Sequence, residues 1–456
     1  MTPDKVAADM VSNDMLAAGF VCNAEFKHLP AGAVQMAKRC LLDFVGVALG
    51  SRSMPAVESG LGLLSALGAS DDATIIGCNR KAPVIGAVWT NSMLGSAMDF
   101  EDGYYPSVGH PASVIFPVTL AIAERQGSNA QEFLTASIIG YEICARAGML
   151  MTKTYRQRPR GSGGSSVYGA ASAAARLLGL SCRQTQTALG IAGAYMTAVP
   201  VLKSHAHEAM IKGGIPWGAV VGTAAAFLAE KGFTGPPATL QDPYESGFDP
   251  NARQVLESLG QEYEIFNVYF KRYPSCRWTH AALDAAANIM CEHKLAVDRI
   301  ASIRVETFKE ATALDLRRPA SLEGVQFSIP YSVALLLAEG EFGVAQMSLA
   351  CLKNPTVQGL ADKVQLHVAP DLDEMFPGRR PARVTITDDR GFVLTSEVIE
   401  VHGEPGSNFA TQRVDDKFRR LAADRLGTAQ AEEIHQTILK LENLSSLRPL
   451  MSLLEG

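Results

Sequence analysis

The stretch 31–50, AGAVQMAKRCLLDFVGVALG, decides the fold of the first half of the chain. Its apolar residues recur at helical spacing, and it ends in a glycine, which is common where helices stop. The same pattern of apolar residues at helical spacing recurs at 113–127, 130–150, 166–180 and 182–198. The many alanines and glycines on apolar faces predict helices packed closely together. We therefore expect residues 1–268 to form a large helical domain.

The texture changes near residue 270. Alternating polar and apolar residues at 300–308, 364–372, 382–389 and 391–401 predict strands, and Asp388–Gly391 is typical of a hairpin turn. Helical runs lie between them at 279–294 and 330–340. Residues 269–405 are therefore predicted to be an α+β domain with an antiparallel sheet and helices on one face. Helices return over 406–456, and we expect them to pack back on the first domain.

Composition narrows the class of protein. At 456 residues the chain is too long for one ordinary domain, and its 47% hydrophobic residues suit a large core. A net charge of −6 and the absence of a basic run argue against a nucleic-acid partner. No stretch has the roughly 20 strongly apolar residues of a membrane span. The N-terminus lacks a signal pattern, and the eight cysteines lack metal-ligand spacing, so we predict a cytoplasmic protein with reduced thiols.

Several motifs are judged to carry no chemistry. No glycine-rich nucleotide loop follows a strand. The glycine-rich run Gly161–Gly164 is interpreted as a flexible connector between helices. His205 and His207 lack a third ligand at convincing spacing, so they are assigned to a polar loop rather than a metal site.

Four polar segments remain as candidates for a site. They hold an acidic stretch at 95–113, a basic cluster at 156–160, a lysine at the head of an apolar helix, and a basic run before the helix at 279–294. Each alone is more typical of a solvated surface. Together they supply the groups needed to remove a proton next to a carboxylate while cations hold that carboxylate. The residues are Asp99, Glu101, Asp102, His110, Arg156, Arg158, Arg160, Lys212, Lys271, Arg272, Arg277 and His280.

At this point the chain resembles a known family, the MmgE/PrpD family. The resemblance is carried by AKRCLLDFVGVALG, AMDFEDGYYPSVGHPAS, GYEICAR, FLAEKGFTGPPATLQ, KRYPSCRWTHAALDAA, FSIPYSVALLLAEGE and FPGRRPARVTITDDRG, in that order along almost the whole chain. It implies a helical domain and an α+β lid, a homodimer, and an active site between the domains. It also implies a small polycarboxylate substrate with no cofactor and no metal.

The resemblance also assigns roles to residues. Its motifs imply the catalytic set Asp99, His110, Lys212, His280 and Tyr331. The basic residues implied to bind substrate are Arg158, Arg160, Lys271 and Arg277.

This sequence departs from the family pattern at several places. The usual histidine before the segment 166–180 is missing, and Arg160 or a nearby serine stands there. Ser96 stands where many relatives carry histidine, and Glu101 replaces an aspartate. The segment after Lys212 lacks the usual Leu-His pair. Because a lyase that expels hydroxide needs an acid at the leaving group, known substrates should not be transferred directly.

The leading hypothesis is an enzyme that abstracts a proton α to a carboxylate of a small di- or tricarboxylate. A lyase similar to 2-methylcitrate dehydratase comes first. An epimerase similar to iminodisuccinate epimerase, or a decarboxylase of the cis-aconitate type, is the alternative. A non-catalytic homologue that binds carboxylates is a further alternative from another class.

Overall fold

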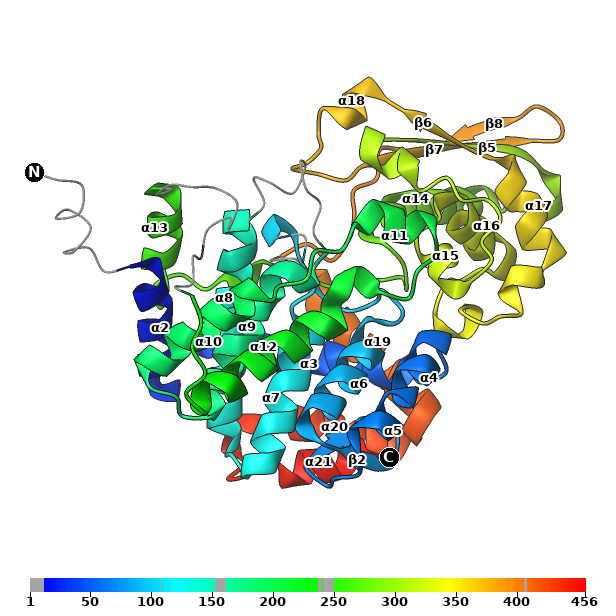
Figure 1. The fold of residues 1–456 in the computed structure, drawn as a ribbon. Coiled ribbons are helices and arrows are strands. Elements are labelled where there is room, and N and C mark those ends of the chain that lie inside the picture. The colour runs from blue at the N-terminus through cyan, green and yellow to red at the C-terminus, as the bar shows by residue number, and fades with distance from the viewer. Residues whose placement is uncertain (1–11, 108, 152–160, 237–239, 241–249, 406–407) are drawn as a thin grey trace, which may run out of the picture.

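The computed structural model describes residues 12–107, 109–151, 161–236, 240, 250–405 and 408–456. Helices dominate the part before the lid: α2 (Asn13–Asn23), α3 (Ala31–Gly50), α4 (Pro55–Gly62), α5 (Leu64–Leu67), α6 (Val84–Ser96), α7 (Ala112–Gln126), α8 (Ala130–Met151), α9 (Gly163–Leu177), α10 (Cys182–Ala194), α11 (Val201–Ala206), α12 (Ile215–Glu230) and α13 (Pro250–Glu257). Among them α9 packs against both α8 and α12 at the centre of the body (Figure 1). A side chain at Gly222 of α12 would collide with Ala170 of α9, so small residues do bring these helices close.

The C-terminal helices are part of this helical body. They are α19 (Asn408–Leu426), α20 (Thr428–Leu439) and α21 (Arg448–Glu455). Helix α19 packs along α3, and the backbone of the fully buried Phe418 lies against Gly46. Figure 1 shows the C-terminal helices α20 and α21 in the lower part of the molecule, and α20 also contacts α3. The helical body is therefore built from both ends of the chain.

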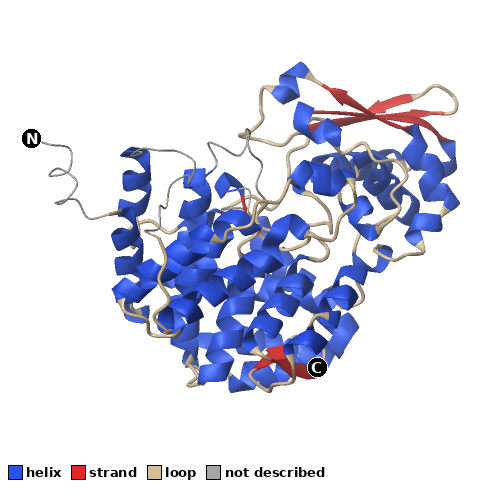
Figure 2. Cartoon of the chain, viewed as in Figure 1, coloured by secondary structure: helices blue, strands red, loops and turns tan. Residues whose placement is uncertain are grey.

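The lid consists of one four-stranded sheet with helices beneath it (Figure 2). The strand order is β6-β5-β7-β8. Helices α14 and α17 pack on β7 and β5, and α16 packs on α14 and α17. The bounds are β5 (Ile300–Thr307), β6 (Val364–Val368), β7 (Ala382–Asp388), β8 (Val393–Thr395), α14 (His280–His293), α15 (Leu322–Gln326), α16 (Ile329–Glu339), α17 (Pro355–Lys363) and α18 (Pro370–Asp373).

The lid sheet is mixed rather than wholly antiparallel. The pairs β5–β7 and β7–β8 are antiparallel, and the turn at Asp388–Gly391 closes the second pair as predicted. Strand β6 pairs with β5 in parallel. Parallel neighbours need a long crossover, and the segment containing α15, α16 and α17 supplies it. The protein is therefore mainly helical with an α+β second part, which confirms the predicted fold class.

Two small sheets were not predicted. Strands β1 (Ala73–Ile75) and β2 (Arg80–Ala82) form a hairpin within the helical body. Strands β3 (Gly103–Tyr104) and β4 (Val268–Tyr269) pair antiparallel with each other. This second pair joins the acidic stretch near residue 100 to the segment that runs from β4 to the start of α14 and leads into the lid, which we call the junction. It therefore brings two of the predicted polar segments together.

One described helix, α8, is long and apolar enough to cross a membrane by length and composition. Of its most apolar window, 94% is buried inside the protein, as in the core helix of a soluble protein. A second span would require α3 to be counted with α4 and α5, across a bend of 88°. All eight cysteines are unpaired thiols.

Candidate active site

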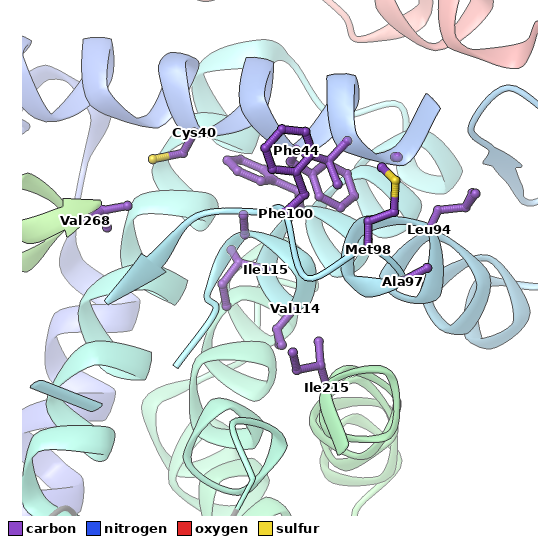
Figure 3. Packing of buried hydrophobic residues seen from close by; sticks show 14 of the residues in the cluster. Cys40, Phe44, Leu94, Ala97, Met98, Phe100, Val114, Ile115, Ile215 and Val268 are labelled. Atoms are coloured by element: carbon purple, nitrogen blue, oxygen red, sulfur yellow. The ribbon is translucent and has the colours of Figure 1, made fainter. Parts of the chain in front are cut away.

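The loop after α6 carries the acidic stretch and has an unusual backbone. Asp99 adopts a positive φ of 49°, a conformation that few residues other than glycine adopt. Its neighbour Phe100 points into the core below α3, where Phe44 also lies (Figure 3). Strained backbone of this kind persists only when its surroundings hold it, and it clusters at functional sites.

Asp99 is held by two cationic or protonatable groups. The Lys271 ammonium donates to the Asp99 carbonyl oxygen at 2.8 Å and to Oδ1 at 2.7 Å. His110 Nε2 lies 3.8 Å from the same Oδ1. Burial alone would raise the pKa of Asp99, but the charges of Lys271 and His110 lower it below its usual range. Burial would likewise lower the pKa of Lys271, but Asp99 raises it. The lowered pKa of Asp99 and the raised pKa of Lys271 both favour the charged forms, as expected for an ion pair.

His110 has a fixed orientation. Its Nδ1 lies 2.7 Å from the carbonyl oxygen of Asp102. A carbonyl can only accept, so Nδ1 carries a proton and Nε2 is the nitrogen that faces Asp99. This is the arrangement of an acid–base histidine whose second nitrogen is free to exchange a proton.

Two more buried carboxyl groups lie beside His110. Glu101 Oε1 is 3.9 Å from His110 Nδ1, and neither carboxyl oxygen of Glu101 has a hydrogen-bond partner among the described residues. Burial raises the pKa of Glu101, against the opposing effect of His110. Burial also raises the pKa of Asp102, to about 8. Both groups therefore favour the protonated form.

Lys212 approaches from the start of α12. Its φ is 50°, so it shares the strained conformation of Asp99. The ammonium donates to Gln326 Oε1 at 2.6 Å and lies 3.8 Å from Glu323 Oε1. Gln326 in turn donates to the carbonyl of Ala97 at 3.0 Å, just before Asp99. Burial lowers the pKa of Lys212, partly offset by Glu323 and Asp99.

The glycine run before α9 presents Lys212. Side chains at Gly161 and Gly163 would collide with the backbone of Gly213 and Gly214, which follow Lys212 directly. The prediction of a flexible connector is therefore wrong for Gly161 and Gly163. These glycines allow two backbones to touch, and this contact holds the strained lysine in place.

His205 belongs to the same neighbourhood. Its ring stacks on Phe327, with centroids 3.6 Å apart, and Phe327 follows Gln326 in the chain. Burial lowers the pKa of His205 to about 4, and the charges of Asp99, Lys212 and Lys271 also act on it. The sequence interpretation of a polar loop missed this residue. The only signal for His205 in the sequence was its position shortly before Lys212, the lysine at the head of an apolar helix.

The C-terminal helix α19 supports the site from behind. The Lys417 ammonium donates to Asp43 Oδ1 at 2.8 Å, to the Phe100 carbonyl at 2.6 Å and to the Lys271 carbonyl at 3.4 Å. It also lies 3.8 Å from the centre of the Phe100 ring. One lysine therefore ties together α3, the acidic loop and the junction.

One group of donors could hold a metal ion. Ligand atoms of Asp99, Glu101 and His110 all lie within 4.8 Å of one another. The Lys271 ammonium already neutralises Asp99 at 2.7 Å, so the donor set is built around a protein cation.

Comparison with known proteins shows the family of the chain. The MmgE/PrpD N-terminal domain matches residues 16–250, and the MmgE/PrpD C-terminal domain matches residues 273–443. The chain belongs to the MmgE/PrpD family. A cis-aconitate decarboxylase-like protein of Aspergillus oryzae is 26% identical, covering 94% of each chain. The cis-aconitate decarboxylase of Aspergillus terreus is 26% identical over 95% of this chain and 94% of its own. The human cis-aconitate decarboxylase is 25% identical over 94% and 92%. With these relatives, the MmgE/PrpD chain is identified as a lyase-type enzyme.

The structure brings some predicted residues of this MmgE/PrpD site together. Asp99, His110, Lys212 and Lys271 form the cluster described above. Arg158 and Arg160 lie outside the described residues, so their predicted role stays a prediction.

His280 lies on the lid side of the junction. Its Nε2 is 3.3 Å from the Ser275 carbonyl, and its buried Nδ1 has no partner among the described residues. Burial and the charges of Arg277 and Lys271 lower its pKa well below the usual range. Burial therefore favours the neutral imidazole, with a nitrogen that has no hydrogen-bond partner among the described residues, and its predicted catalytic role stays a prediction. No described contact joins it to Asp99.

Two other predicted residues have their polar groups directed elsewhere. The Tyr331 hydroxyl donates to the Cys351 carbonyl at 2.7 Å within the lid. Arg277 donates to Glu404 Oε1 at 2.6 Å and to the carbonyls of Phe270 and His402. Arg277 thus fastens the junction. The predicted catalytic role of Tyr331 and substrate-binding role of Arg277 stay untested predictions.

Proposed function

We propose that this protein is a cofactor-independent decarboxylase that acts on cis-aconitate or a tricarboxylate of the same shape. The observation that carries the proposal is the cluster around Asp99, in which Lys271 Nζ lies 2.7 Å and His110 Nε2 3.8 Å from Oδ1, with the buried Lys212 linked to the same loop through Gln326. The buried Lys212 ammonium suits a substrate carboxylate, and the imidazole suits proton transfer. The curated relatives, which are named for the decarboxylation of cis-aconitate, support the same choice.

The reaction requires one proton and releases one CO2. The C–C bond to one carboxylate breaks, and its electron pair forms a new C=C bond. The electron pair of the former double bond takes up a proton at the carbon next to a second carboxylate. In our assignment His110 delivers that proton from Nε2, because Nδ1 is committed to the Asp102 carbonyl. Asp99 stabilises the charged imidazole, and Lys212 stabilises the negative charge that grows on the second carboxylate.

A hydro-lyase is the second candidate, and Glu101 is the observation that favours it. Its buried carboxyl has a raised pKa and no hydrogen-bond partner among the described residues. A protonated carboxyl of this kind could protonate a leaving hydroxide. The substrate would then be a hydroxy tricarboxylate that loses water.

Product analysis distinguishes the two candidates. Purified protein is incubated in deuterated water with cis-aconitate, and separately with 2-methylcitrate and citrate, and products are followed by NMR. The decarboxylase predicts CO2 release and one deuterium in the new methylene group of itaconate. Water loss from a hydroxy acid without CO2 release from cis-aconitate would overturn it in favour of the hydro-lyase.

Two variants connect the activity to the site. Lys212→Met and His110→Asn should each lower kcat by at least about a hundredfold, in line with the usual contribution of a positioned acid or base. Lys203→Met, an exposed lysine on α11, is the matched control and should leave kcat unchanged. The homodimer and the cytoplasmic location also remain proposals.

A further inference from the structure

Arg380 is a buried cation without an acidic partner. The residue precedes β7 in the lid and is 7% exposed. Its only described hydrogen bond goes from Nη2 to the Pro377 carbonyl at 3.5 Å. No carboxylate of the described residues forms an ion pair with it. The adjacent Arg379 differs in both respects, since its side chain is 57% exposed and pairs with Glu400 at 2.7 Å.

An unpaired buried guanidinium needs an explanation. Arginine is almost never buried without a partner, because removing the charge from water costs more than packing returns. Here the Tyr105 ring lies against the group, with its centroid 3.4 Å from the guanidinium carbon, and Glu404 acts on it only at long range, without forming an ion pair with it. A ring covers one face of the planar group and leaves its edge of N–H donors available. That edge is the part of arginine that binds a carboxylate in bidentate fashion.

Arg380 lies against the loop that carries Asp99. Tyr105 belongs to the same loop as Asp99, and its hydroxyl donates to the Pro377 carbonyl, so the lid segment before Arg380 touches this loop. Asp99 and Arg380 both lie near enough for their charges to act on the thiol of Cys276 and the hydroxyl of Tyr269. The guanidinium therefore lies on the side of the junction where the acidic loop meets the lid.

The other described cations of the junction are already paired. Lys271 forms its ion pair with Asp99, and Arg277 forms its ion pair with Glu404. Among the described residues, Arg380 is thus a buried guanidinium that forms no ion pair and lies against the loop that carries Asp99.

We propose that Arg380 binds a carboxylate of the substrate that does not react. This inference rests on the proposed function insofar as it names a polycarboxylate as the ligand. One carboxylate lies against Lys212 at the reacting carbon, and another lies against the edge of Arg380 on the lid. The residue thereby selects substrates that carry an additional carboxylate at the correct reach.

Binding of unreactive acids tests this proposal. Calorimetric titrations with acetate, succinate and propane-1,2,3-tricarboxylate are run on the full-length protein and on Arg380→Gln, Arg380→Lys and Arg379→Gln. We expect the parent to bind the tricarboxylate more tightly than succinate. Arg380→Gln should weaken the tricarboxylate by about tenfold to a hundredfold, as expected for a lost charged hydrogen-bonding pair. It should leave acetate, whose single carboxylate can be held by Lys212 alone, within about twofold, a change worth less than half of a tenfold step.

The remaining variants separate binding from folding. Arg380→Lys keeps the charge without the fork, so its loss should be smaller than that of Arg380→Gln and its thermal unfolding should match the parent. Arg379→Gln is the matched control and should bind every acid as the parent does. Equal binding of the tricarboxylate by parent and Arg380→Gln would overturn the proposal. Equal losses in Arg379→Gln, or no carboxylate binding by the parent, would also overturn it.

The result of the binding experiment does not depend on whether the protein decarboxylates cis-aconitate. Failure of turnover with Arg380-dependent tricarboxylate binding would reject the proposed function and keep this inference. Turnover of cis-aconitate with a KM that Arg380→Gln does not change would support the proposed function and reject this inference. If both hold, Arg380→Gln should raise KM far more than it lowers kcat, because the bound carboxylate does not react.

Discussion

Asp102 makes the stability of this protein depend on pH in a predictable direction. Its side chain is fully buried, with Oδ1 3.0 Å from the Ala112 amide nitrogen and Oδ2 2.8 Å from the Tyr141 hydroxyl. Burial raises its pKa from 3.8 to about 8. The folded protein therefore keeps the proton between these two values, while the unfolded chain loses it. Stability from this group is complete below pH 4 and falls as the pH rises toward 8.

Asp102→Asn removes the titration and keeps the shape of the protonated group. Each pKa unit corresponds to about 1.4 kcal/mol, so the parent should lose about 3 kcal/mol relative to the variant between pH 5 and pH 7. Urea unfolding of both proteins at pH 5, 6 and 7 measures this difference directly. Asp71→Asn, which removes an exposed carboxylate, is the control and should follow the parent at every pH.

Parallel pH curves for the parent and Asp102→Asn would refute the reasoning. They would mean that Asp102 is ionised in the folded protein and that its negative charge is compensated. If Asp102→Asn gained stability relative to the parent as the pH fell, the sign of the effect would be contradicted.

Three further variants test contacts that surround the site. Gly161→Ala should destabilise the protein by about 1–3 kcal/mol in thermal unfolding and lower kcat/KM, because its Cβ collides with the Gly213 carbonyl; normal activity would show that the backbone contact is unnecessary. Lys417→Met should cost about 3–5 kcal/mol in urea unfolding, because Asp43 is left buried and unpaired, and adding Asp43→Asn should recover most of that loss. His205→Phe keeps the stacked ring and should lower kcat/KM by about tenfold or more if its nitrogens act on the substrate; unchanged steady-state rates would leave His205 a packing residue.

The fold could be predicted largely because its patterns are local. Helical spacing over 31–50 and 130–150 is confirmed by α3 and α8, and alternation over 300–308 and 382–389 is confirmed by β5 and β7. The direction of β6 could not be predicted, because alternation marks a strand without giving its partner. The small pair β3–β4 was missed because two-residue strands carry no period at all.

The site could be predicted only in part. Asp99, His110 and Lys212 are brought together as the family motifs implied. The role of Gly161 could not be inferred, because a close backbone approach depends on a partner about 50 residues away in the chain. Arg380 escaped notice because its significance lies in burial without a carboxylate, which no local pattern records.

The pairing of β3 with β4 has a mechanical consequence. The two strands are hydrogen-bonded within a few residues of Asp99 and Lys271, at the point where the chain passes into the lid. If the lid rotates as a rigid unit about this pivot, displacement grows with distance from it. The ion pair and Arg380, which stacks on Tyr105 directly after β3, then lie close to the pivot and keep their geometry, while the parts of the lid sheet farther from it travel furthest. Adjustment to substrates of different length therefore falls to the lid, and the proton-transfer geometry remains constant.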